Sequence, residues 1–323
     1  MLPPFRRFLA ILAAMMVMAV THPTQATAAP PKAPPAPAAP QTPYFGVSLE
    51  HAPWDMSELE TLASSLDRRP TQVMWYDAWS SGTGFPAQQA SAVAAFGATP
   101  VITWEPWNPA GGVDQPAFAL DTITAGRHDD YLTMWAKQVR AYSKPVVLRF
   151  AHEMNGSWYP WAAGINGNTA ADYVAAWKHV AGLFARQRVK NVTWSWSPNV
   201  PYPGSTPLAS LYPGDSTVGI VALDGYNWAG LLPGSSWTSF RDVFAQGQQE
   251  LAALTSKPVS IGEVGAPEVG GDKGQWVRDM FTYLATQPNI AGFTWFSHLK
   301  EADWRINSSE TSLAAFRDGL ATY

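Results

Sequence analysis

Two glutamates follow apolar segments of the sequence, and both stand in unusual surroundings. Glu153 comes three residues after VVLRF (146–150), within RFAHEMNGSWYPW (149–161), where large aromatic residues flank it. Glu263 ends the apolar segment VSIGE (259–263). Cleavage of a glycosidic bond needs two facing carboxyl groups, because one protonates the leaving oxygen while the other attacks the anomeric carbon or activates water. The two residues are therefore candidates for this chemistry, provided that the fold brings them together.

The elements that would position them follow a regular order. Short apolar runs alternate with stretches whose apolar residues recur with a period near 3.6, such as 55–66, 172–187, 239–254 and 275–287. This alternation is typical of a parallel sheet covered by helices on both faces, and eight strands indicate a (β/α)8 TIM barrel. An open doubly wound sheet is the alternative, but SLEHAPW (48–54) is not its glycine-rich turn. The predicted strands are 45–49, 72–76, 101–105, 146–150, 192–196, 219–223, 259–263 and 292–296.

In such a barrel the chemistry lies at the carboxyl ends of the strands, so residues 110 positions apart can meet at one rim. Seven of the eight predicted strands end at or just before an ionisable residue. We interpret Asp77 and Asp224 as helix N-caps, a common role for aspartate at this position. The same explanation does not account for so many glutamates, so the rim is predicted to be acidic and aromatic. The residues concerned are Glu50, Asp77, Glu105, Glu153, Asp224, Glu263 and His298.

The motifs around these residues resemble glycoside hydrolase family 26. The most specific is RFAHEMNGSWYPW, where a histidine directly precedes the glutamate and Met-Asn-Gly follows it. The resemblance covers residues 44–323, and its other motifs are IGEVGA (261–266), TWEPW (103–107), WSWSPN (194–199) and DGYNW (224–228). It implies that Glu153 is the general acid/base and Glu263 the nucleophile, with retention of the anomeric configuration. It also implies that Tyr226 donates a hydrogen bond to the nucleophile.

Physical requirements extend these assignments. Glu153 must be protonated at the working pH, which needs a desolvated site, and Trp158 and Trp161 are near enough in sequence to form one. The positive charge of Arg149 would keep Glu263 ionised. His152 would contact the sugar or hold Glu153. For each residue a structural role remains the alternative: rim caps or salt bridges for the glutamates, an ion pair for Arg149, and core packing for His152 and Tyr226.

Tryptophan is abundant, with 16 residues in a chain of 323. Several lie at or just beyond predicted strand ends, where flat faces for sugar rings would be needed. The resemblance implies that Trp295, at the end of the eighth strand, forms the floor under the reacting sugar. Core packing is the alternative for about half of the set. The candidates for substrate binding are Trp104, Trp107, Trp158, Trp161, Trp228 and Trp295.

Composition excludes several other functions. The net charge of −4 gives no electrostatic basis for binding nucleic acid, and the absence of cysteine excludes thiolate metal sites and thiol nucleophiles. His152 and Glu153 begin an H-E-x-x-H zinc motif, but Gly156 stands where its second histidine is required. The six histidines include no pair at metal-ligand spacing, so we expect neither a metal nor a cofactor.

The first residues resemble an export signal. Arg6 and Arg7 precede thirteen apolar residues (8–20), and ATAAP (26–30) resembles a cleavage site after Ala28. We therefore predict a signal peptide over 1–28, a Pro/Ala-rich linker over 29–43 and a hydrolase barrel over 44–323. An uncleaved anchor is the alternative. After cleavage we expect a monomer without stable membrane insertion, in the periplasm or outside the cell.

The sequence therefore predicts a secreted, retaining endo-glycosidase whose partner is a polysaccharide. Members of family 26 mostly cleave β-mannan, while others cleave mixed-linkage β-glucan or β-1,3-xylan, so β-1,4-mannan and mixed-linkage β-glucan are the expected substrates. The TWEPW motif slightly favours glucanase-like members. Two alternatives remain: a barrel of the cell envelope that binds polysaccharide without cleaving it, and a hydrolase that trims the exopolysaccharide of its own cell.

Overall fold

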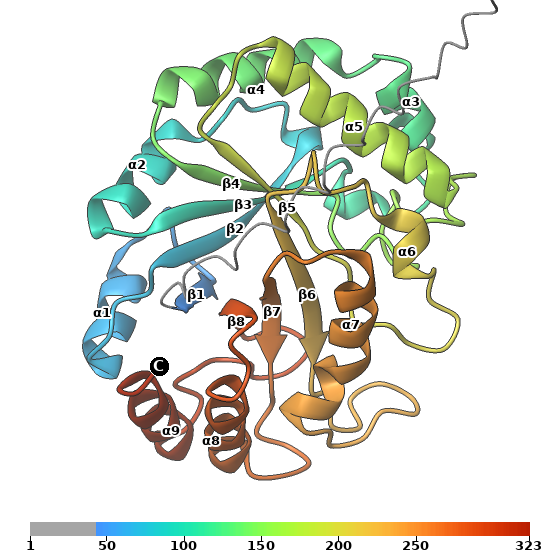
Figure 1. Ribbon diagram of the computed structural model, residues 1–323. Helices are drawn as coiled ribbons and strands as arrows, with labels where there is room; N and C mark the ends of the chain where they lie inside the picture. The colour runs from blue at the N-terminus through green and yellow to red at the C-terminus, as the bar shows by residue number, and fades with distance from the viewer. Residues whose placement is uncertain (1–42) are drawn as a thin grey trace, which may run out of the picture. The chain divides into compact units, whose positions relative to one another are not determined.

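Eight parallel strands close into a barrel in sequence order, with helices around the outside (Figure 1). The computed structural model describes residues 43–323, so the predicted signal peptide and nearly all of the linker lie outside the described residues. The prediction of a (β/α)8 barrel is confirmed. The strands are β1 (Tyr44–Leu49), β2 (Gln72–Ala78), β3 (Thr99–Glu105), β4 (Val146–Phe150), β5 (Val192–Trp196), β6 (Ile220–Tyr226), β7 (Val259–Gly265) and β8 (Ile290–Ser297).

The helices follow the strands and are set by local sequence signals. Helix α5 begins with a capping box, in which Thr169 and Asp172 bond to each other's backbone N–H groups. Ser239 and Asp272 cap α7 and α8 in the simpler way, each accepting one backbone N–H. The helices are α1 (Ser57–Leu66), α2 (Ala87–Phe96), α3 (Leu120–Thr124), α4 (Asp129–Tyr142), α5 (Ala170–Arg186), α6 (Leu208–Leu211), α7 (Phe240–Leu254), α8 (Lys273–Leu284) and α9 (Glu310–Leu320).

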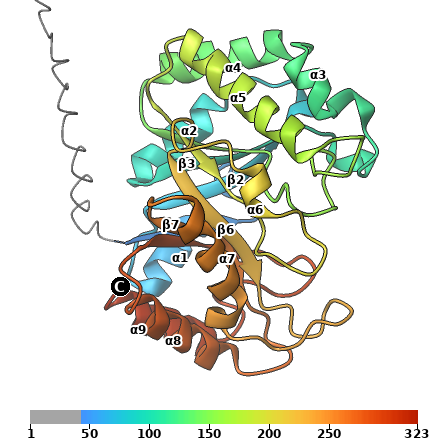
Figure 2. The same cartoon turned by 45° about the vertical axis from the view of Figure 1, so that its right-hand side comes forward.

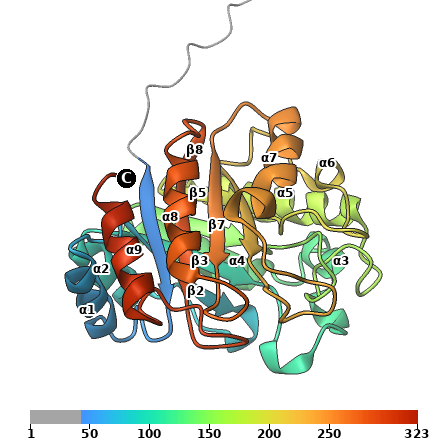
Figure 3. The same ribbon diagram turned by 90° about the horizontal axis from the view of Figure 1, so that it is seen from below.

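The barrel closes where its first strand, β1, pairs with its last strand, β8. The register runs from Tyr44 opposite Gly292 to Leu49 opposite Ser297, six pairs in all. At the carboxyl end, the Ser48 hydroxyl lies 2.8 Å from Nε2 of His298. Helices α8 and α9 lie side by side outside this seam (Figures 2 and 3).

Side chains alternate along each strand between the barrel interior and the layer under the helices. On β3, Thr103 points inward and accepts a hydrogen bond from Arg149. Its neighbour Trp104 points outward and packs against Trp135 of α4, with ring centroids 4.7 Å apart. This outer layer contains much of the tryptophan, which is why a tryptophan at a strand end need not face the site. In the described part of the chain, no helix is long and apolar enough to cross a membrane.

Candidate active site

The chain leaves β4 in a strained conformation that aims Glu153 at the mouth of the barrel. Ala151 and Glu153 have φ of +45° and +51°, in the left-handed region that residues other than glycine rarely adopt. Neighbouring strands hold this turn from both sides. The N–H of Ala151 donates to the carbonyl of Trp104 (3.1 Å) on β3, and that of Glu153 donates to the carbonyl of Ser197 (2.7 Å), just after β5.

The carboxyl group of Glu153 is buried and accepts two hydrogen bonds. Asn199 Nδ2 donates to Oε1 (3.0 Å), and the Trp158 indole donates to Oε2 (2.7 Å). Asn199 is itself held by Asn155, which donates to its carbonyl and accepts from its N–H, both at 2.9 Å. The motif after β4 therefore supplies the carboxyl group and, through Asn155, also orients one of its partners.

Burial is the main cause that raises the pKa of Glu153, and the negative charge of Glu263 raises it further. This direction is the one that a general acid needs. Desolvation is the cause that the sequence analysis expected. Trp158 lies against the carboxyl group, but it also donates a hydrogen bond that favours the charged carboxylate and lowers the pKa. Trp161 instead donates to the carbonyl of His152 (2.7 Å).

Glu263 is held by side chains from three other strands, through two hydrogen bonds and one ion pair. Tyr76 of β2 donates to Oε1 (2.8 Å), Arg149 Nη1 of β4 lies 2.8 Å from the same oxygen, and Tyr226 of β6 donates to Oε2 (2.5 Å). The side chain is almost fully buried. Two hydroxyl groups that donate to one carboxylate and a guanidinium that forms an ion pair with it fix its orientation and stabilise its negative charge. The contacts expected for Arg149 and Tyr226 are both present.

Arg149 has a second partner that the sequence analysis interpreted wrongly. Its Nη2 is paired with Asp224, which was expected to be a helix N-cap. Strand β6 continues past Asp224 to Tyr226, so the side chain lies in the barrel interior with no exposed surface. The hydroxyl of Ser197 also donates to it (2.9 Å). Two carboxylates therefore share one buried guanidinium.

His152 is buried beside the two glutamates and belongs to an aromatic cluster. Its Nε2 lies 3.0 Å from the hydroxyl of Tyr159, and the Tyr76 ring centroid is 6.1 Å from its own. Burial and the charge of Arg149 hold the pKa of His152 well below its usual range, so the imidazole is neutral. Tyr159 stacks on Trp161 at 4.3 Å, which fixes the cluster from behind.

The predicted sugar-binding tryptophans fall into two groups. Trp104, Trp161 and Trp295 have no exposed surface, so their assignment as sugar platforms is corrected: they pack the core. Trp295 faces α9, where it meets Phe316 at 4.6 Å, because it lies on the outward register of β8. Trp107, Trp158 and Trp228 remain at least partly exposed.

Among these, Trp158 is the most open, with 39% of its surface exposed. It stacks on Tyr202 at 5.9 Å and 29°, so a flat aromatic surface lies directly beside Glu153. The sequence analysis missed Tyr202, as well as Tyr76, Tyr159 and Asn199. Asn199 ends the WSWSPN motif and Tyr76 directly follows an apolar run, but only the fold reveals which carboxyl group each one meets.

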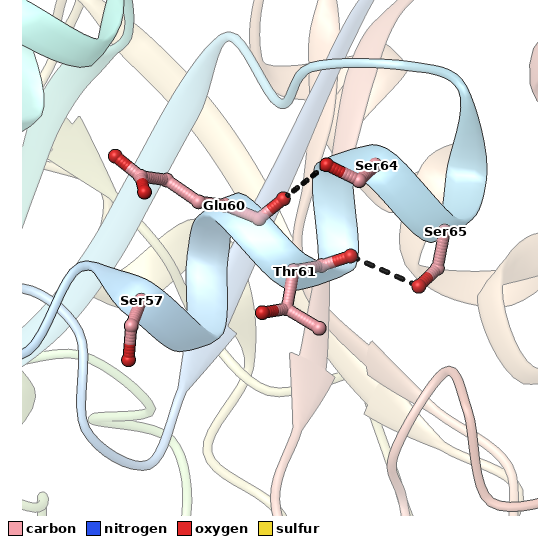
Figure 4. A pocket seen from close by; sticks show the side chains of 5 residues that line it. All are labelled: Ser57, Glu60, Thr61, Ser64 and Ser65. Atoms are coloured by element: carbon pink, nitrogen blue, oxygen red, sulfur yellow. Dashed lines mark hydrogen bonds between the residues drawn. The ribbon is translucent and has the colours of Figure 1, made fainter.

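Two other features do not contribute to this site. No group of three or more potential ligands among residues 43–323 could hold a metal ion. The hollow drawn in Figure 4 lies along α1 and is lined by residues of that helix alone. Two of its three serines, Ser64 and Ser65, donate to the helix's own carbonyls, those of Glu60 and Thr61 (both 2.9 Å), so these hydroxyls are already used within the helix.

Comparison with known proteins agrees with this geometry. The sequence model described as "Glycosyl hydrolase family 26" matches residues 76–307, a region that includes Glu153, Glu263 and Arg149. The chain belongs to family 26. One relative is the "Endoglucanase H" of Acetivibrio thermocellus, 37% identical over 247 residues, 75% of this chain and 26% of the relative. Another is the "Mannan endo-1,4-beta-mannosidase A and B" of Caldalkalibacillus mannanilyticus, 35% identical over 128 residues, 38% of this chain and 22% of the relative.

The chain thus spans about a quarter of the length of these relatives. A solved family 26 β-mannanase from Bacteroides ovatus superposes with a TM-score of 0.65 at 17% identity, covering 86% of this chain and 88% of that one. At this identity the likeness concerns the fold.

Proposed function

We propose that this family 26 protein is a retaining endo-glycosidase that cleaves β-linked polysaccharide, with Glu153 as acid/base and Glu263 as nucleophile. The single observation that carries the proposal is the contrast between two buried carboxyl groups at one rim. The pKa of Glu153 is raised, as proton donation requires, while Glu263 forms an ion pair with a guanidinium and accepts from two tyrosine hydroxyls.

The reaction follows from these two states. Glu263 attacks the anomeric carbon while Glu153 gives its proton to the glycosidic oxygen, which leaves with the departing chain. Glu153, now a carboxylate, takes a proton from water, which attacks the glycosyl–enzyme and restores Glu263. Two displacements retain the anomeric configuration, and ¹H NMR of the first product detects this directly.

The proposed substrates are mixed-linkage β-glucan and β-1,4-mannan. Glucan is supported by the relative that matches most of this chain, an endoglucanase, while mannan is supported by the mannosidases that match shorter regions. The exposed stack of Trp158 and Tyr202 offers a flat surface for a chain of sugars on the side of the acid.

The test is release of reducing sugar by the purified full chain from mixed-linkage β-glucan, mannan, glucomannan, β-1,3-xylan and carboxymethylcellulose. We expect activity on glucan or mannan that is absent in Glu263→Ala. A folded protein that releases nothing from any polymer would contradict the proposal and favour a polysaccharide-binding role. Activity that survives in Glu263→Ala would remove that residue from the mechanism.

We also propose that the protein acts outside the cytoplasm, in the periplasm or beyond. The support is the pattern of residues 1–28, a basic start and thirteen apolar residues before small ones. Amino-terminal sequencing of the protein recovered outside the cytoplasm should begin near residue 29. Recovery of the full-length chain only from the cytoplasm would contradict export.

A further inference from the structure

A third carboxyl group lies at the same rim, and the mechanism does not use it. Glu105 is the last residue of β3, two positions beyond Thr103, whose hydroxyl points into the barrel. Because side chains on a strand alternate, Glu105 points into the barrel as Thr103 does. It lies at the carboxyl end of the strands, where the reacting glutamates also lie. Only 5% of its surface is exposed.

Within residues 43–323, the Glu105 side chain makes no hydrogen bond of good geometry and no ion pair. The indole of Trp107, two residues further on, lies close enough to affect its pKa, yet its N–H is also buried without a partner. Proteins rarely leave a buried N–H group without a partner, because this costs free energy, and the Trp107 indole is such a group. The Glu105 carboxyl group beside it is largely buried and makes no hydrogen bond of good geometry or ion pair in the described part of the chain, so the donor and the acceptor together are suited to a ligand that pairs with both.

The charges around Glu105 place it within the reaction site. Its carboxyl group interacts electrostatically with Arg149 and Glu263, and the hydroxyl of Tyr159 interacts with all three glutamates. Burial raises the pKa of Glu105 to about 8, so near neutral pH the group is largely protonated and can donate as well as accept. Such a group pairs well with sugar hydroxyls, which also do both.

We propose that Glu105 and the Trp107 N–H together bind adjacent hydroxyl groups of the sugar unit that lies against Glu263. This rests on the proposed function, in which that unit becomes attached to Glu263. The pair makes the enzyme selective for neutral sugars with free neighbouring hydroxyls. A uronic acid would bring a second negative charge close to the Glu263 carboxylate and is rejected.

The test measures binding, so it does not depend on turnover. Calorimetry compares a mixed-linkage glucan tetrasaccharide and mannotetraose on a Glu263→Gln parent and on the same parent carrying Glu105→Ala, Glu105→Gln or Trp107→Phe. We expect Glu105→Ala to weaken binding of the preferred oligosaccharide about 10- to 100-fold. Glu105→Gln should lose less of this affinity, because an amide also donates and accepts hydrogen bonds. Trp107→Phe keeps a ring but removes the N–H and should cost several-fold.

Thermal unfolding distinguishes a binding role from a structural one. Removing an unpaired buried carboxyl group should leave the melting temperature of Glu105→Ala unchanged or higher, while binding falls. The matched control is Asp77→Asn on neighbouring β2. Asp77 follows the inward-facing Tyr76, so it points to the helix layer, where its charge acts on Tyr131. This variant should bind like the parent.

The outcomes separate this proposal from the proposed function. If Glu105→Ala and Trp107→Phe bind within twofold of the parent, the Glu105 proposal is wrong even if the wild type cleaves polymer. If the parent binds through Glu105 but the wild type cleaves nothing, the subsite stands and the hydrolase assignment fails. A parent that binds neither oligosaccharide overturns the subsite for these sugars. Tight binding of a glucuronate-containing oligosaccharide would contradict the predicted selectivity.

Discussion

At the scale of single residues, the site is defined by how each carboxyl group is solvated and paired. Glu153 is desolvated and bonded only to neutral donors, Asn199 and Trp158, whereas Glu263 contacts a cation. This difference supports the two roles proposed for them, acid/base for Glu153 and nucleophile for Glu263. Each role predicts a different change in rate when the leaving group can depart without a proton.

Glu153→Ala should slow hydrolysis of the polymer by about 100- to 10,000-fold, the usual size of general acid catalysis. It should slow the glycosylation step of a dinitrophenyl β-glycoside far less, because that leaving group departs without a proton. Glu263→Ala should be inactive on both substrates. Pre-steady-state kinetics on the two substrates makes the comparison, and an equal loss on both in Glu153→Ala would contradict its role as the acid.

The pH dependence follows from the raised pKa of Glu153. The protonated form is required, so kcat/KM falls as the pH rises through this pKa, and the alkaline limb should lie above the ordinary glutamate range near about 4.3. The hydrogen bond from Asn199 lowers the pKa, so Asn199→Ala should move the limb to higher pH. Tyr202→Phe, which touches Trp158 but not the carboxyl group, is the control. A limb that moves downward in Asn199→Ala would contradict the assignment.

At this scale the sequence predicted the contacts of Arg149 and Tyr226 with Glu263, because motifs carry these residues, while the catalytic roles of the two glutamates stay predictions. It failed for Trp104 and Trp295, since an apolar run alone does not say which of two faces its last residue takes. The contact between Thr103 and Arg149 shows which side chains of β3 face the barrel interior, and this contact is visible only in the folded structure. Asp224 was misinterpreted for the same reason.

At the scale of elements, the turn after β4 is the feature on which the acid depends. Ala151 is fully buried and left-handed, with φ of +45°. A β-branched side chain is strongly disfavoured there. Ala151→Val should therefore destabilise the protein by about 1–3 kcal/mol, while Ala151→Gly, which adopts this φ freely, should stay within about 1 kcal/mol.

Urea unfolding of the two Ala151 variants measures this difference. Equal stability of the valine and glycine forms would show that the backbone strain has no energetic weight. In the valine variant we also expect a loss of activity larger than its unfolded fraction explains, because the turn aims Glu153.

The elements themselves were largely predictable. The strands β4 and β5 have the predicted bounds, β6 begins one residue later and ends three residues later than predicted, and the other strands extend the predictions by one or two residues at one or both ends. Continuous apolar runs identify buried strands well, but the end of a strand depends on pairing with its neighbour. The irregular registers of β7, between Ile261 and Val264 against β8, have no signal in the sequence.

At the scale of the whole molecule, Arg149 connects several strands near the carboxyl end of the barrel. Its guanidinium contacts Thr103 of β3, Asp224 of β6 and Glu263 of β7 from its own place on β4. The arginine is only 1% exposed, so the contacts are not screened by water. Removing the central positive charge of such a buried network should therefore destabilise the protein.

Arg149→Met should cost about 3–5 kcal/mol, because it leaves two carboxylates buried without their cation. Adding Asp224→Asn should recover part of this stability by removing one of the charges. Thermal unfolding of the single and double variants measures the coupling. A single variant as stable as the wild type would mean that the network has no net role in holding the barrel together.

The pairing of β1 with β8 also determines when the barrel can form during synthesis. Tyr44 and Gly292 are partners, so the seam cannot close until β8 has left the ribosome. Until then both β1 and β7 present unpaired edges, which attract other chains. Contacts over such long stretches of sequence also slow folding. A ribosome stalled before β8 should therefore carry an open, aggregation-prone sheet, and chaperone demand during synthesis should end abruptly once β8 emerges.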